Sequence, residues 1–152
     1  MKEINLLTLS HNALTLYAAL CKPVCRELGI PQTAFDILML LTNHSKLSTA
    51  REITDYSGIK KNLVSTHVEK LVAQGYLKRA PVPKDRRQVR LVVTDKALSV
   101  IEKGRRMQRY YYDFLTQGLT ETELVQIQRQ MTIVAANIDA LSQKLHEDAP
   151  LE

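Results

Sequence analysis

The hydrophobic pattern of residues 49–93 constrains the fold most, because its period changes from that of helices to that of strands. Thr49 and Glu52 lie three residues apart and predict a capping box at the start of a short helix that ends at Gly58. A second helix is expected over residues 60–74. Its predicted buried side chains are Leu63, Val64, Val68, Leu71 and Val72.

Two short strands are expected after Gly75, at residues 76–79 and 88–93. The segment between them contains two prolines and several charges, which is typical of a stiff, exposed turn. The order of a short capped helix, a basic helix and a hairpin with a charged tip is that of a winged helix-turn-helix. The predicted fold class is therefore mainly α, with one small hairpin.

Longer helices flank this segment on both sides. One is expected over residues 4–28, kinked or split at Pro23, and another over 31–41, apolar on more than one face and therefore buried at the centre. Thr94 is the expected N-cap of a helix that reaches about Leu115. Thr120 and Glu123 predict a second capping box at the start of the last helix.

The last helix carries apolar residues at alternating steps of three and four, which predicts a coiled-coil-like seam. A narrow seam of this kind packs on another helix, either in the same chain or in a partner. The seam residues are Leu124, Ile127, Met131, Val134, Ile138, Leu141 and Leu145.

Charge is concentrated in the middle of the chain. Residues 60–109 contain fourteen Lys and Arg against four Asp and Glu, whereas the segments before and after them are neutral and acidic. Such a local excess favours a polyanionic partner such as nucleic acid, although a solvated face would have the same composition. In a helix-turn-helix, polar side chains at the start of the second helix reach base edges in the major groove.

Residues 58–79, the triplet Asp85, Arg86 and Arg87, and residues 91–94 together resemble the MarR family of bacterial transcriptional regulators. The resemblance implies a homodimeric repressor that binds a pseudo-palindromic DNA site. It also implies one domain over 1–152, with a winged helix-turn-helix DNA-binding region at 31–94 and a helical dimerisation region at 1–30 and 95–146. Members of the family bind small aromatic or phenolic anions.

The resemblance assigns roles to individual residues. The base-reading positions fall on Lys61, Asn62, Ser65 and Thr66, and Thr66 stands where many relatives have Arg. In the wing, Arg87 is the minor-groove arginine, held by Asp85, with Arg86 beside them. Phosphate contacts are expected from Lys60, Lys70, Lys84, Arg86 and Arg90, and these set affinity and salt dependence rather than sequence preference.

An effector pocket is expected to use His11, Arg106, Tyr110 and Tyr111, since tyrosine rings with a nearby arginine suit an aromatic anion. The alternative is that these residues belong to the core and to a solvated face. Cys21 and Cys25 lie one helical turn apart and could form a redox switch, but both continue the apolar stripe of the first helix, which favours buried structural thiols.

Other function classes are disfavoured. The sequence has no nucleophile with a base, no paired carboxylates and no phosphate-binding glycine loop, so an enzyme is not expected, and neither is a cofactor. The four histidines share no ligand spacing, so no metal site is predicted. Two cysteines and the lack of a signal peptide or a membrane-length apolar run predict a cytoplasmic protein that does not enter membranes. A winged-helix module for protein association would not need the basic helix or the arginines of the wing.

Overall fold

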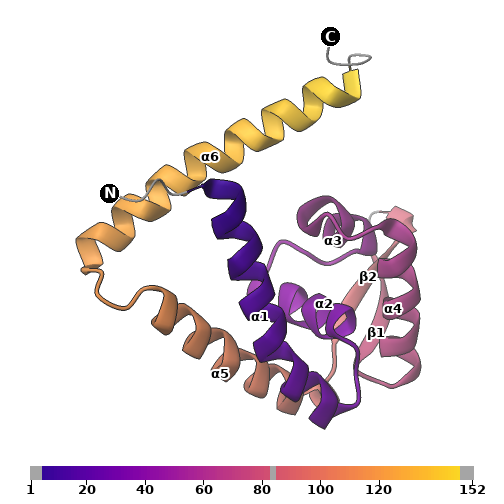
Figure 1. Ribbon diagram of the computed structural model, residues 1–152. Coiled ribbons are helices and arrows are strands. Elements are labelled where there is room, and N and C mark those ends of the chain that lie inside the picture. The colour runs from indigo at the N-terminus through magenta and orange to yellow at the C-terminus, as the bar shows by residue number, and fades with distance from the viewer. Residues whose placement is uncertain (1–4, 83–84, 148–152) are drawn as a thin grey trace. The chain divides into compact units, whose positions relative to one another are not determined.

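The computed structural model describes residues 5–82 and 85–147, without the side chains of residues 85–88, 146 and 147. The chain divides into two compact units, Met1–Tyr111 and Tyr112–Glu152, and each is described by itself. The elements of Figure 1 are α1 (Leu6–Leu28), α2 (Gln32–Asn43), α3 (Ala50–Ser57), α4 (Lys61–Ala73), β1 (Leu77–Val82), β2 (Asp85–Val93), the 3-10 helix η1 (Asp95–Ala97), α5 (Leu98–Leu115) and α6 (Glu121–Glu147).

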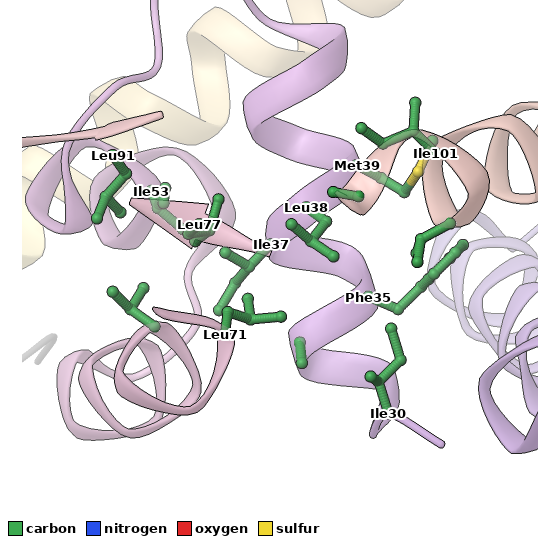
Figure 2. Packing of buried hydrophobic residues seen from close by; sticks show 14 of the residues in the cluster. Ile30, Phe35, Ile37, Leu38, Met39, Ile53, Leu71, Leu77, Leu91 and Ile101 are labelled. Carbon is green, nitrogen blue, oxygen red and sulfur yellow. The ribbon is translucent and has the colours of Figure 1, made fainter. Parts of the chain in front are cut away.

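Helix α2 forms the centre of the first unit, as its apolar sequence predicts. Phe35, Ile37 and Leu38 are fully buried. In Figure 2, Ile37 points toward Leu71 of α4 and Leu77 of β1, whereas Phe35 and Met39 lie on the side of Ile101 from α5. Because α2 is covered on more than one side, it holds the helices and the hairpin of this unit on one core.

The close approach of α5 to α2 depends on Gly104. A Cβ atom at this position would overlap the sulfur of Met39 and lie 3.0 Å from the ring of Phe35. A larger residue there would therefore force the side chains of Met39 and Phe35 to shift.

The helix-turn-helix has the predicted local structure. Thr49 Oγ1 accepts a hydrogen bond from the backbone N–H of Glu52 at 3.2 Å, and Glu52 Oε2 accepts one from the backbone N–H of Thr49 at 2.9 Å. Gly58 ends α3 at φ 69°, a left-handed conformation that favours glycine. The capping box and this glycine together fix where α3 stops and α4 begins.

The hairpin is longer than the sequence predicts. Strands β1 and β2 pair antiparallel from Leu77 with Val93 to Pro81 with Val89, and the register shifts between Pro81 and Val82. The backbone N–H of Leu91 also donates to the carbonyl of Ser48 at 2.6 Å, which ties the base of the wing to the segment before α3. Pairing with β1 extends β2 to Asp85, a residue expected in the turn.

The structure corrects three local predictions. Helix α1 is not split at Pro23, because the buried Cys21 and Cys25 hold it on the core on either side of the proline. Thr94 is the N-cap residue, as predicted, but it caps η1 without a side-chain bond; its hydroxyl donates to the carbonyls of Gly75 and Tyr76, at the base of the hairpin. Leu63 is 43% exposed, because α4 buries Val64, Val68 and Leu71 and packs the partly buried Val72 against the core.

The second unit consists mainly of α6. Its predicted capping box is present: Glu123 Oε2 accepts from the backbone N–H of Thr120 at 2.8 Å and from its hydroxyl at 2.7 Å. Leu124 and Val134 of the seam are half-buried, and the other five seam residues are exposed. Within the described ranges, none of the helices combines the length and hydropathy needed to cross a bilayer.

Candidate nucleic-acid interface

The exposed face of α4 gathers the predicted base-reading residues. Lys61, Asn62, Ser65 and Thr66 are all exposed in its first two turns, while Val64 and Val68 are buried on the opposite side. Positions three and four residues apart are neighbours on a helix, so Ser65 lies beside Lys61 and Asn62, and Thr66 lies beside Asn62. The core contacts of α4 therefore decide which side chains it presents.

The Thr66 hydroxyl is already used within α4. It donates a hydrogen bond to the carbonyl of Asn62 at 2.9 Å. In this arrangement Thr66 presents a hydroxyl oxygen that accepts hydrogen bonds, and its methyl group, to a neighbouring molecule. An arginine at this position would present donors instead, so the chemistry of this face differs from that of the relatives with Arg.

Helix α3 adds a basic residue that the sequence does not single out. A cavity of about 320 Å³ between α3 and α4 is lined by Ala50, Arg51, Thr54, Asp55, Lys61 and Ser65. Arg51 is almost fully exposed and lies 3.6 Å from Asp55. The local composition gave little signal for Arg51, because the first 59 residues are neutral as a whole. Only the packing of α3 on α4 brings it beside Lys61 and Ser65.

Three of the other predicted phosphate contacts lie among the described residues. Lys60, Lys70 and Arg90 are exposed; Lys60 caps α4, Lys70 follows Thr66 by one turn, and Arg90 lies on β2. Lys84 lies outside the described residues, as do the side chains of Asp85, Arg86 and Arg87, so the contact between Asp85 and Arg87 stays a prediction.

The three cavities that we describe in this structure are not lined by His11, Arg106, Tyr110 or Tyr111, the residues predicted for an effector pocket. His11 is exposed, Arg106 pairs with Glu102 at 3.6 Å, and Tyr110 is 60% exposed. Tyr111 is half-buried: its hydroxyl donates to the carbonyl of Ala13 at 2.7 Å. Its ring meets that of Tyr17 edge-on, with 5.5 Å between the ring centroids. Tyr111 thus joins α5 to α1, which is a structural contact.

Two cavities of the first unit are lined by other residues. One, of about 430 Å³, lies at the base of the wing and has Arg90, Arg105 and Asp95 among its residues. The other, of about 390 Å³, is lined by Tyr17, Asp36, Met39, Leu40, Asn43, His44, Ser57, Ile59 and Gln108. We refer to the second as the acidic cavity.

Hydrogen bonds connect the polar residues of the acidic cavity. Asn43 Nδ2 donates to Gln108 Oε1 at 2.9 Å, and Gln108 Nε2 donates to the hydroxyl of Tyr17 at 3.0 Å. The Tyr17 hydroxyl in turn donates to Asp36 Oδ1 at 3.4 Å. Burial raises the pKa of Asp36 to about 6, and hydrogen bonds from Tyr17 and Gln32 lower it in part.

The two cysteines lie in the core. Cys21 is fully buried and Cys25 is 8% exposed. Burial raises the pKa of the Cys21 thiol to about 12 and raises the pKa of Cys25 as well. Redox-active cysteines are exposed and have a lowered thiol pKa. The buried environment of Cys21 and Cys25 therefore favours a structural role in the core. Among the described residues, no three His, Cys, Asp or Glu side chains are grouped as a metal site.

Comparison with known proteins agrees with this architecture. Residues 28–88 match the model of the MarR family. The HTH-type transcriptional repressor IacR of Pseudomonas putida is 24% identical over 115 residues, which cover 76% of this chain and 67% of IacR. These matches confirm the predicted resemblance to the MarR family.

Solved structures confirm the fold. A MarR family regulator from Listeria monocytogenes, solved in complex with 26mer DNA, has a TM-score of 0.83 and 18% identity over 100% of this chain and 99% of its own. Bordetella bronchiseptica BpsR, whose DNA binding is regulated by 6-hydroxynicotinic acid, has a TM-score of 0.65 and 18% identity over 89% of this chain and 96% of its own.

Proposed function

We propose that this chain is a transcriptional repressor of the MarR family that binds double-stranded DNA as a homodimer. The observation that carries the proposal is the exposed polar face of α4, held outward by buried Val64, Val68 and Leu71. A helix of this kind fits the major groove, where each base pair presents a distinct pattern of donors and acceptors. The DNA-bound relative from Listeria supports this use of the fold.

The side chains on α4 have separate roles in the proposed complex. Asn62 can make two hydrogen bonds to adenine, Lys61 can donate to guanine, Ser65 can donate to or accept from a base edge, and Thr66 can accept a hydrogen bond there. Arg51, Lys60, Lys70 and Arg90 surround this face and would contact phosphates, which fix the register of the protein on DNA. Arg86 and Arg87 of the wing would reach the narrower minor groove.

The seam of α6 supports the dimer. Five of its seven apolar residues are exposed in the single chain, and a second copy of α6 would cover them. A two-fold dimer places two α4 helices in successive major grooves, so the operator would be an inverted repeat with half-sites about 10 base pairs apart. A small aromatic effector would relieve repression by preferring one geometry of the dimer over the other.

A selection experiment tests this function. The chain is mixed with a randomised duplex pool over a series of salt concentrations, binding is followed by fluorescence anisotropy, and the retained DNA is sequenced. We expect an enriched inverted repeat and an affinity that falls steeply with salt. Salt-sensitive binding without an enriched sequence would contradict sequence-specific regulation, and no binding at any salt would favour a protein-association module.

Paired variants separate the two kinds of contact. Asn62→Ala should cost about 1–3 kcal/mol at one base position and relax the preference there. Lys70→Ala should weaken all sequences equally and reduce the salt slope by about 1. Lys22→Ala, an exposed lysine of α1, is the control and should change neither. Equal effects of Lys22 and Lys70 would show that α4 is not the DNA-binding face.

A further inference from the structure

The acidic cavity combines one carboxylate with an apolar wall. Met39 and Leu40 of α2, Ile59 of the turn before α4, and Asp36 are among the residues that line it. Its volume of about 390 Å³ lies within the range of small-molecule sites. The cavity can therefore hold a small ligand with an apolar body and a polar end.

The acidic cavity has a negatively charged side chain in its lining and no lysine or arginine to balance it. Asp36 is its only carboxylate, and neither lysine nor arginine is among the residues that line it. The only other polar groups are the hydroxyls of Tyr17 and Ser57, the amides of Asn43 and Gln108, and the imidazole of His44. The Tyr17 hydroxyl is the only partner from α1 and α5 that reaches Asp36 directly, and Gln108 reaches it through Tyr17. Asp36 accepts hydrogen bonds from the neutral side chains of Tyr17 and Gln32, and the imidazole of His44 contacts Tyr56.

The half-buried carboxylate of Asp36 lies in a cavity lined by no lysine or arginine, and a cationic ligand would pair with it there. A ligand with its own carboxylate or phenolate would add a second negative charge beside Asp36, which is unfavourable. We therefore expect the cavity to favour cationic ligands over the aromatic anions that the family resemblance implies.

We propose that the acidic cavity binds a small aromatic amine, with its ammonium group on the carboxylate of Asp36 and its ring against Met39, Leu40 and Ile59. The sulfur of Met39 suits contact with an aromatic ring. The role of the amine as an effector rests on the proposed function. The existence of the binding site does not depend on that function.

The position of the cavity connects it to the DNA-binding face. Ser57 ends α3 and lines the cavity; its hydroxyl donates to the carbonyl of Ile53 at 2.7 Å and accepts from the backbone N–H of Ile59 at 3.2 Å. These bonds hold the turn that leads into α4. A ligand that contacts Ser57 and Ile59 acts directly on the start of the proposed recognition helix, and it shifts DNA binding if its affinity differs between the free and DNA-bound geometries.

Three ligands of similar size and different charge test the proposal: 2-phenylethylamine, 2-phenylethanol and phenylacetate. They are titrated into the full chain by calorimetry at about pH 7, where the amine is protonated and Asp36 is mostly ionised. We expect saturable binding of the amine, at least about tenfold tighter than that of the alcohol, with phenylacetate the weakest. Equal binding of the amine and the alcohol, tighter binding of phenylacetate, or no saturation by the amine at millimolar concentrations would overturn the proposal.

An isosteric variant assigns the charge to one residue. Asp36→Asn should lower the affinity for the amine by at least about tenfold and leave the alcohol nearly unchanged. Asp55→Asn is the matched control, because Asp55 is an exposed aspartate of α3 that does not line the acidic cavity. Unchanged amine binding in Asp36→Asn would refute the site. If this variant does not fold, the three ligands on the unaltered chain decide the question.

A second measurement keeps the site and the function apart. Anisotropy on the selected operator is repeated with and without saturating 2-phenylethylamine, and a fall in DNA affinity is expected. A DNA affinity that is unchanged by the bound amine would overturn the role of the amine as an effector. The proposed DNA-binding function would then still stand. Amine binding without any DNA binding would overturn the proposed function and leave the cavity as a ligand site.

Discussion

The core of the first unit and helix α6 have similar apolar patterns and opposite surroundings. Among the described residues, the buried hydrophobic side chains all lie between Cys21 and Ile101, and α6 contributes none. Yet α6 has 27 residues and an apolar seam as regular as any stripe in the core. The same apolar spacing thus marks a buried face in the core of the first unit and an exposed face on α6.

This difference shows that apolar periodicity identifies which face of a helix packs against another surface. It does not identify that surface. Single exposed apolar residues are common on proteins, but a continuous row along a long helix marks an interaction surface. For the core, the partner is the chain itself. For α6, we propose a second copy of the chain, and three predictions test the contrast.

The largest effect is expected in the core. Phe35→Ala should lower the free energy of unfolding by about 3–5 kcal/mol, because Phe35 is fully buried at the centre of the first unit. Phe114→Ala changes the same residue type at a position that is 66% exposed, and about 0.5 kcal/mol or less is expected. Chemical denaturation at one chain concentration measures both. A large loss at Phe114 would mean that the region after Tyr111 is covered more than the single chain suggests.

A smaller effect is expected from the seam. Ile138→Glu should shift the dimer toward monomer and weaken operator binding by about a hundredfold, because the two DNA-binding regions would no longer be linked. Ile133→Glu is the matched control: Ile133 and Ile138 are 57% and 61% exposed in α6, but only Ile138 lies on the seam. Sedimentation equilibrium and anisotropy measure the two outcomes. If Ile133→Glu dissociates the dimer equally, the seam is not the interface.

The smallest effect is expected at the helix caps. Thr49→Ala removes the side-chain acceptor from the capping box of α3, a helix that packs on the core. It should lower the free energy of unfolding by about 1 kcal/mol. Thr120→Ala removes the equivalent acceptor from α6, which has no buried residue, and should have a smaller effect on global unfolding. Equal losses in thermal unfolding would show that the two helices belong to one cooperative structure.

The caps also predict a pH dependence. Hydrogen bonds from Ser48 and Thr49 hold the pKa of Glu52 below its usual value, and those from Thr120 do the same for Glu123. A carboxyl with a lowered pKa in the folded state stabilises the fold above its unfolded pKa of about 4.3, and this contribution is lost as the pH falls through the folded value. Glu52→Gln should therefore reduce the loss of stability on acidification.

Local chemistry explains what could be predicted of the fold. The boxes at Thr49 and Thr120 and the glycine at 58 depend on residues within four positions of each other, and each is present. The side-chain cap of Thr94 and the burial of Leu63 were predicted wrongly, because contacts with segments far along the chain decide them. The hydroxyl of Thr94 bonds to Gly75, 19 residues away.

The candidate sites divide in the same way. The exposed face of α4 follows from helical spacing and a basic composition, so its residues could be named from the sequence. The acidic cavity could not, since Tyr17 and Gln108 are 91 residues apart and meet only through packing. A lone aspartate within the apolar run of α2 was the single local signal of that cavity.

The sequence by itself determined the helices, their ends, the basic face of α4 and the apolar seam of α6, because short-range hydrogen bonds and the period of apolar residues encode them. The tertiary structure alone decided that α1 passes unbroken through Pro23, that Arg51 lies beside Lys61, and that Asp36 lies in a cavity without a cation. These features depend on burial and on long-range contacts, and neither is a property of neighbouring residues.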